Sequence, residues 1–205
     1  MVSAEAPPLV PRLVEGVPSE RLLAANLAAL AACDADLARR LAQWRPDASS
    51  PKVTVRPAAS GLPTVLYNRL HIHSAYDPVA EAALQAARVP AEAPRVMALG
   101  FGAGHLLATM LLREALQRLD VVPLSLPVLR AVAAAVDLRP LLCDPRLRLV
   151  SEECPALSTP FVAVPPLLRL ADPGCSELSR AALAALSLEA RAMVSAPTES
   201  RRQHA

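Results

Sequence analysis

The sequence predicts an α/β fold with a mainly parallel sheet and flanking helices, preceded by an N-terminal helix and a small β-hairpin. Three observations predict it. The apolar run 96–99 is followed by Gly100, Gly102 and Gly104, and then at once by an apolar-periodic helix. Further short apolar runs alternate with helical segments downstream, which is typical of a parallel sheet with right-handed crossovers. Upstream, Val53 and Val55 alternate with polar residues, as in a hairpin strand.

The N-terminal part begins with a proline-rich segment, 1–18, that we expect to be disordered. A helix is predicted from Arg21 to about Leu41, because leucines recur there at helical spacing. Asp34 lies in a segment typical of a helix cap, so this helix can divide in two. The hairpin follows, with a second strand over Pro63–Tyr67 and a short third strand within 70–74.

A further helix is predicted to begin after Tyr76 and to end near Arg88. Asp77 is expected to be its N-cap and Pro78 its first residue. Glu81 is spaced to reach back, as in a capping box.

The C-terminal half repeats short apolar runs and helical segments. We expect a helix from the glycines to about Leu119, strands at 119–122, 147–150 and 161–164, and helices at 126–136 and 177–193. The expected organisation is a disordered segment (1–18), a region of helix, hairpin and connecting helix (19–93), a Rossmann-like domain (94–194) and a disordered tail (195–205).

The glycine segment is the candidate ligand site. A strand, a glycine-rich turn and a helix in this order are typical of Rossmann-like (methyltransferase-like) domains, where the turn and helix N-terminus approach a cofactor. The predicted cofactor-binding residues are Gly100, Phe101, Gly102, Gly104 and His105. A nucleotide sugar or S-adenosylmethionine is the cofactor that such a turn would take. A tight turn without a ligand explains the same glycines, and His105 is either a donor to a ligand or a half-exposed helix residue.

A working site of this kind normally has an acidic residue after the next strand, where it accepts hydrogen bonds from a ribose. Pro123, Leu124 and Ser125 stand there instead, and Asp120 comes too early in the strand. The missing carboxylate favours a non-catalytic domain over a cofactor-dependent enzyme, and no residue is assigned a catalytic role.

Composition excludes several classes. The net charge is +2 with interspersed signs, which argues against nucleic-acid binding. No apolar stretch is long enough to span a bilayer and no signal peptide is visible, so we expect a cytoplasmic protein. The four cysteines have no metal-ligand spacing, and His71 and His73 lack a third ligand, so no metal site is predicted. Serine-hydrolase and phosphate-binding-loop motifs are absent from the sequence.

Two motifs together resemble a known family. The chain is similar, over about 26–170, to the N-terminal region of motility associated factor (Maf) glycosyltransferases and their 6-hydroxymethylpterin pyrophosphokinase-like relatives. The first motif is His73-Ser74-Ala75-Tyr76-Asp77-Pro78 with Glu81-Ala82 after it, and the second is Leu99-Gly100-Phe101-Gly102-Ala103-Gly104. Asn26–Leu30, Asp144–Leu147 and Val164–Leu170 resemble further segments of the family. His73, Ser74, Tyr76 and Asp77 are the family-motif residues.

The resemblance implies machinery for flagellin glycosylation, in which the transferase portion follows this region. The chain departs from the family pattern at Ala75, where a basic residue is expected, at His105, where a tyrosine is expected, and at 123–125, where an acidic residue is lost. A truncated, diverged accessory domain is the expectation, and its partner would be a glycosyltransferase or another protein.

Three hypotheses follow. The first is a non-catalytic accessory domain that binds a partner protein. The second is a small-molecule enzyme, either a methyltransferase-like or a nucleotide-sugar-binding transferase, that uses the Gly100–His105 loop. The third is a gene fragment without a selected activity.

Overall fold

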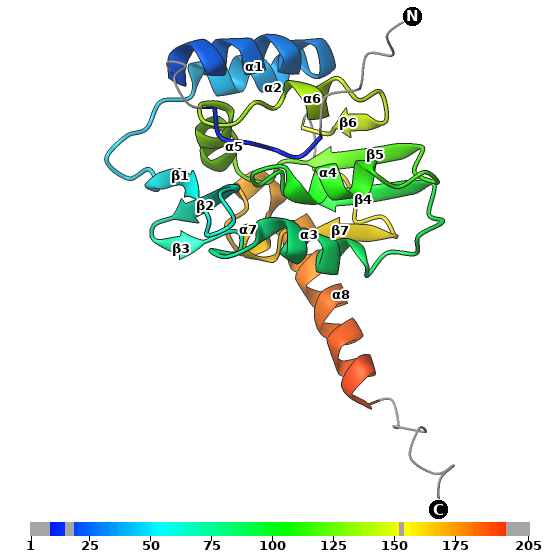
Figure 1. Ribbon diagram of the computed structural model, residues 1–205. Helices are drawn as coiled ribbons and strands as arrows, with labels where there is room; N and C mark the ends of the chain where they lie inside the picture. Colours follow the sequence, from blue (N-terminus) through cyan, green and yellow to red (C-terminus); the bar gives the residue numbers. More distant parts are fainter. Residues whose placement is uncertain (1–8, 15–18, 152–153, 196–205) are drawn as a thin grey trace, which may run out of the picture.

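The computed structural model describes residues 9–14, 19–151 and 154–195. It confirms the predicted α/β class, because a parallel sheet of order β6-β5-β4-β7 lies beside an antiparallel sheet of order β1-β2-β3 (Figure 1). The strands are β1 (Val53–Pro57), β2 (Pro63–Tyr67), β3 (Leu70–His71), β4 (Arg95–Leu99), β5 (Arg118–Val122), β6 (Leu147–Leu149) and β7 (Phe161–Ala163).

Helices surround the two sheets. They are α1 (Ser19–Cys33), α2 (Ala35–Gln43), α3 (Pro78–Ala86), α4 (His105–Leu111), α5 (Leu126–Ala133), α6 (Arg139–Leu142), α7 (Pro165–Arg169) and α8 (Ser176–Ser195). The N-terminal α1 and α2 pack on each other and on α5 and α6, and α3 packs on α4. The last part of α8 extends away from the rest of the molecule (Figure 1).

The strand order places β4, the first strand of the parallel sheet, in its interior. Both its neighbours are parallel to it, and Leu99 is level with Val122 of β5 and with Ala163 of β7. The carboxyl ends of these three strands therefore meet at one edge of the sheet. In open α/β sheets this edge is where ligands bind, and the glycine turn leaves β4 there.

Two predicted helix caps, at Asp34 and Asp77, are confirmed. The long N-terminal helix does divide at Asp34, whose carboxylate accepts a hydrogen bond from Leu37 N at 2.8 Å and begins α2. Asp77 is the N-cap of α3 and accepts from Val79 N and Ala80 N at 3.0 Å each. These caps satisfy amide groups that have no partner within the helix.

The predicted length of the helix after the glycines is wrong. Helix α4 ends at Leu111 rather than near Leu119. Just beyond it, the Arg113 guanidinium donates to the carbonyls of Ala86, Val89 and Pro90, which holds the chain against the end of α3. The short helices α6 and α7 have no counterpart among the predicted elements, since four or five residues carry too little periodicity to be read.

The link between β6 and β7 crosses from one edge of the parallel sheet to the other. It contains no helix among its described residues, and β7 pairs with β4 rather than with β6. Of the termini predicted to be disordered, 1–8, 15–18 and 196–205 lie outside the described residues. Residues 9–14 run beside the end of α5, where Val14 N donates to Ala135 O at 3.1 Å. The domain division at residue 93 stays a prediction. No helix in the described part of the chain has the length and apolarity that crossing a bilayer requires.

Candidate functional site

The predicted glycine turn is present at the end of β4. Gly100, Gly102 and Gly104 have φ angles of +93°, +53° and +91°, which side-chain-bearing residues rarely adopt. The turn is hydrogen-bonded to the end of β5, because Gly100 N donates to Val122 O at 2.8 Å and Phe101 N donates to Pro123 O at 3.3 Å. The strand–turn–helix order inferred from the sequence is therefore correct.

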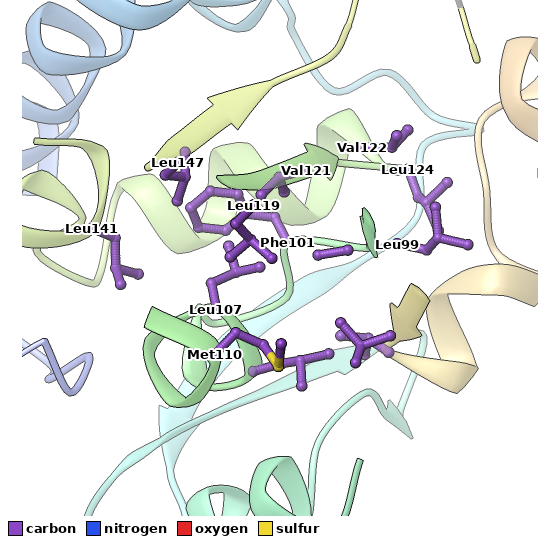
Figure 2. Packing of buried hydrophobic residues seen from close by; sticks show 14 of the residues in the cluster. Leu99, Phe101, Leu107, Met110, Leu119, Val121, Val122, Leu124, Leu141 and Leu147 are labelled. Carbon is purple, nitrogen blue, oxygen red and sulfur yellow. The ribbon is translucent and has the colours of Figure 1, made fainter. Parts of the chain in front are cut away.

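The turn is buried rather than open. Phe101 is 1% exposed and Ala103 is fully buried. Phe101 belongs to the hydrophobic core with Leu107 and Leu119 (Figure 2). A Cβ atom at Gly100 would approach Leu167 at 2.9 Å, and one at Gly104 would approach Leu141 at 2.6 Å. Side chains of this chain thus cover the glycines on several sides.

The His73 side chain occupies the centre of the turn. Its Nε2 accepts a hydrogen bond from Ala103 N at 2.8 Å. A Cβ atom at Gly102 would lie 2.3 Å from the same Nε2. An amide of this kind, in a turn before a helix, is what a cofactor's phosphate or carboxylate would use. In this chain the His73 ring is the partner of that amide and fills the space beside Gly102.

His105 closes the other side of the turn. It is 1% exposed, not half-exposed, because β2 of the antiparallel sheet covers it and its Nε2 lies 2.7 Å from Pro63 O. Its ring meets that of His73 edge to face at 5.6 Å. A carbonyl accepts only, so His105 Nε2 carries a proton and Nδ1 is an acceptor, which has no partner among the described residues.

Both histidines are neutral near pH 7. Burial, with a smaller contribution from His105, lowers the pKa of His73 from 6.5 to about 3. Burial also lowers the pKa of His105, against the opposing effects of Pro63 and Asp77. Glu81 lies 3.9 Å from His73 Nδ1, but a neutral ring forms no ion pair with it.

The remaining family-motif residues form the turn into α3. Ser74 Oγ accepts from Tyr76 N and Asp77 N at 3.1 Å each. The predicted capping box is wrong in one bond, because the Glu81 carboxylate accepts from Ser74 N at 2.7 Å and not from the N-cap amide. Ser74 Oγ takes that amide instead. Tyr76 is 77% exposed, and it joins this turn through its backbone N–H. The motif thus positions His73 and starts α3.

This buried pair predicts a pH dependence of stability. The unfolded chain binds protons at these histidines below about pH 6.5, whereas folded His73 does so only near pH 3. The free energy of unfolding should therefore fall with decreasing pH, by up to about 1.4 kcal/mol per pH unit for His73 alone once the pH is below about 6.5, and His105 should add to the fall. Urea unfolding between pH 7 and pH 5 measures it.

His73→Gln should reduce the slope of unfolding free energy against pH by the amount that corresponds to the uptake of about one proton on unfolding. His71→Gln is the matched control, because His71 is half-buried, pairs with Arg56 and does not contact the glycine turn. An identical slope in the wild type and His73→Gln would contradict the neutral, buried assignment.

A second feature lies at the same edge of the sheet, beyond β5 and β6. A cavity of about 300 Å³ opens there. Its polar and thiol-bearing lining residues are Arg40, Ser125, Ser151, Cys154, Asp172 and Cys175. All four cysteines of the chain are free thiols, and burial raises the pKa of Cys175 to about 12, so this residue is a thiol and not a thiolate at neutral pH.

A carboxylate from a later loop lies beside the end of β5 and lines the cavity. Asp120 is paired with Arg118 at 2.8 Å, away from this role. Asp172, from the loop after α7, instead accepts from Leu126 N at 2.9 Å, and its own N–H donates to Leu124 O at 2.7 Å. Sequence reasoning missed Asp172 because it lies 46 positions after its partner. No grouping of three or more metal-ligating side chains occurs within the described ranges.

Comparisons with known proteins give distant similarities only. No protein-family model matches the chain. No curated protein sequence matches it. Among solved structures it is similar to the Maf glycosyltransferase from Magnetospirillum magneticum AMB-1, with 19% identity and a TM-score of 0.48 over 66% of this chain and 28% of that chain. It is also similar to MnmC2 from Aquifex aeolicus, with 15% identity and a TM-score of 0.33 over 67% of this chain and 57% of that one. The chain thus spans less than two thirds of the length of each.

Proposed function

We propose that this chain is an accessory Rossmann-like domain without catalysis of its own, which acts with a glycosyltransferase or another protein in a flagellin-glycosylation system of the Maf type. The observation that carries the proposal is the buried hydrogen bond from Ala103 N to His73 Nε2. This bond places the His73 ring in the glycine turn, where the enzyme hypothesis would place a cofactor.

The two motifs that resemble the Maf family support the proposal further. His73 belongs to the first motif, and Gly102 belongs to the second. Gly102 is needed because any side chain there would meet the His73 ring. The two motifs therefore pack against each other and connect the segment after the antiparallel sheet to the turn that leaves the parallel sheet. The contact leaves the Ala103 amide paired within the chain rather than free for a ligand.

Thermal unfolding with added cofactors tests this function. S-adenosylmethionine, UDP-N-acetylglucosamine and GDP-mannose should each leave the melting temperature unchanged. A ligand at a hundred times its Kd would add about 2.7 kcal/mol and raise the melting temperature of a chain this long by about 5–10 °C. The alternative, a methyltransferase-like or nucleotide-sugar-dependent enzyme using the Gly100–His105 loop, predicts such a rise.

Amide NMR shows where any ligand binds. A cofactor that shifts the melting temperature and perturbs the amides of Gly102 and Ala103 would overturn the proposal in favour of the enzyme. His73→Ala is an informative second variant, because removing the ring frees the Ala103 amide. Cofactor binding by this variant alone would show that the His73 ring is what keeps a cofactor from the Ala103 amide.

A further inference from the structure

The cavity at the ends of β5 and β6 contains two opposite charges that do not pair with each other. Arg40 of α2 donates from Nη1 to Ser151 O at 3.1 Å, and the rest of its guanidinium has no acceptor among the described residues. Asp172 uses Oδ2 for Leu126 N, while Oδ1 accepts from no group in the described chain. No salt bridge joins Arg40 to Asp172 across the described residues, although both line the same cavity. Each has hydrogen-bonding capacity left for a ligand.

A buried hydroxyl group in the cavity lining also lacks a partner. Ser125 is 2% exposed, and its Oγ makes no hydrogen bond to any described group. It is the N-cap of α5, yet its side chain does not cap the helix. A buried polar group without a partner is costly, and natural proteins retain few of them. A ligand in the cavity would satisfy it.

The preceding residue adds a second unusual feature. Leu124 has a φ of +66°, in the left-handed region, and it is held there by the bond from Asp172 N to its carbonyl. Leucine adopts this conformation at a cost. Asp172 therefore shapes the backbone turn that presents Ser125 at the cavity.

We propose that this cavity binds a small carboxylic acid that carries at least one hydroxyl or amino group. The carboxylate pairs with Arg40, and the hydroxyl or ammonium donates to Asp172 and contacts Ser125. The volume of about 300 Å³ lies at the lower end of small-molecule sites. Asp172 disfavours a phosphate dianion, and the lining offers no aromatic side chain on which a nucleobase would stack. The cavity adjoins the glycine turn through Val122 and Pro123, but no glycine of the turn lines it, and the proposal does not depend on the proposed function.

Titration of the full chain, followed by amide NMR and calorimetry, tests this. The probes are L-serine, D-glycerate and D-gluconate, with acetate and inorganic phosphate as compounds that lack one of the two required features. At least one of the three acids should saturate below about 10 mM and perturb the amides of Ser125, Leu126 and Ser151. Acetate should bind at least about tenfold more weakly.

Variants separate the site from general stability. Ser125→Ala and Arg40→Gln should each weaken binding by about tenfold or more. Asp172→Asn keeps an acceptor for Leu126 N but removes the charge, and should weaken binding of the serine ammonium similarly. Ser179→Ala is the matched control, because Ser179 is equally buried, has an unpartnered Oγ in the described chain and does not line this cavity.

Four outcomes would overturn the proposal. They are no saturation by any of the three acids, binding of phosphate alone, wild-type affinity in Ser125→Ala, and equal loss of affinity in Ser179→Ala. Perturbation of the Gly102 and Ala103 amides by a nucleotide would bear on the proposed function instead. Binding at the cavity therefore tests this proposal, and perturbation of the glycine-turn amides tests the proposed function, so failure of one can be distinguished from failure of the other.

Discussion

Replacing Gly102 with alanine should lower the free energy of unfolding by about 2–5 kcal/mol. The left-handed backbone at φ +53° costs an L-residue about 1–2 kcal/mol. The new Cβ would lie 2.3 Å from His73 Nε2, so the ring must move and the Ala103 amide loses its acceptor. Leaving that buried donor unpaired costs about a further 1–3 kcal/mol. Urea unfolding at pH 7 measures the sum.

Gly61→Ala is the matched control. Gly61 has a φ of +80°, but nothing lies within 4 Å of a Cβ placed there. This variant should therefore show the backbone cost alone, about 1–2 kcal/mol. Equal losses in the two variants would mean that the His73 ring does not occupy the glycine turn.

Asn26→Ala should also be strongly destabilising, by about 3 kcal/mol or more. Asn26 is 1% exposed, and its amide donates to Ala133 O and Val136 O at 2.7 Å each. Its carbonyl oxygen accepts from Leu138 N at 2.9 Å. These three bonds fasten α1 to the segment between α5 and α6. Alanine would leave three buried backbone groups without partners, at about 1–3 kcal/mol each when no water reaches them.

Ser187→Ala provides the comparison for Asn26. Ser187 also bonds from its side chain to a backbone carbonyl, that of Leu183, but on an exposed helix face. Its loss should change stability by less than about 0.5 kcal/mol. A cost under about 1 kcal/mol for Asn26→Ala would show that this anchor is not needed. Chemical denaturation of both variants decides it.

The features that could be predicted from the sequence are those that residues close together in the sequence determine. The caps at Asp34 and Asp77, the glycine turn and the strand before it follow from local rules of backbone geometry and periodicity. Helix α4 was predicted too long because its end depends on Arg113 reaching carbonyls at least 23 positions earlier. The periodicity of residues 105–119 gives no indication of these hydrogen bonds from Arg113.

The site shows the same division. The sequence predicts the glycine turn but not the His73 ring within it, because His73 and its partner Ala103 are 30 positions apart in the sequence. Of the two alternatives for His105, the half-exposed helix residue is wrong, because helical periodicity alone does not reveal that β2 covers this side chain. Asp172 and the anchor Asn26 are recognisable only once distant segments have been brought together. Polar residues with long-range partners are thus the part that single-sequence reasoning misses.

A double-mutant cycle between His73 and Gly102 tests the central claim, that a side chain of this chain occupies the turn, most directly. The cycle compares Gly102→Ala in the wild type and in a His73→Ala background, by urea unfolding at pH 7. Without the ring, the alanine at position 102 should cost only the backbone strain of about 1–2 kcal/mol. The two substitutions should therefore couple by about 1–3 kcal/mol, which is the cost of leaving the Ala103 amide unpaired. Equal costs in both backgrounds would contradict the account, because the ring would then exert no effect on the turn.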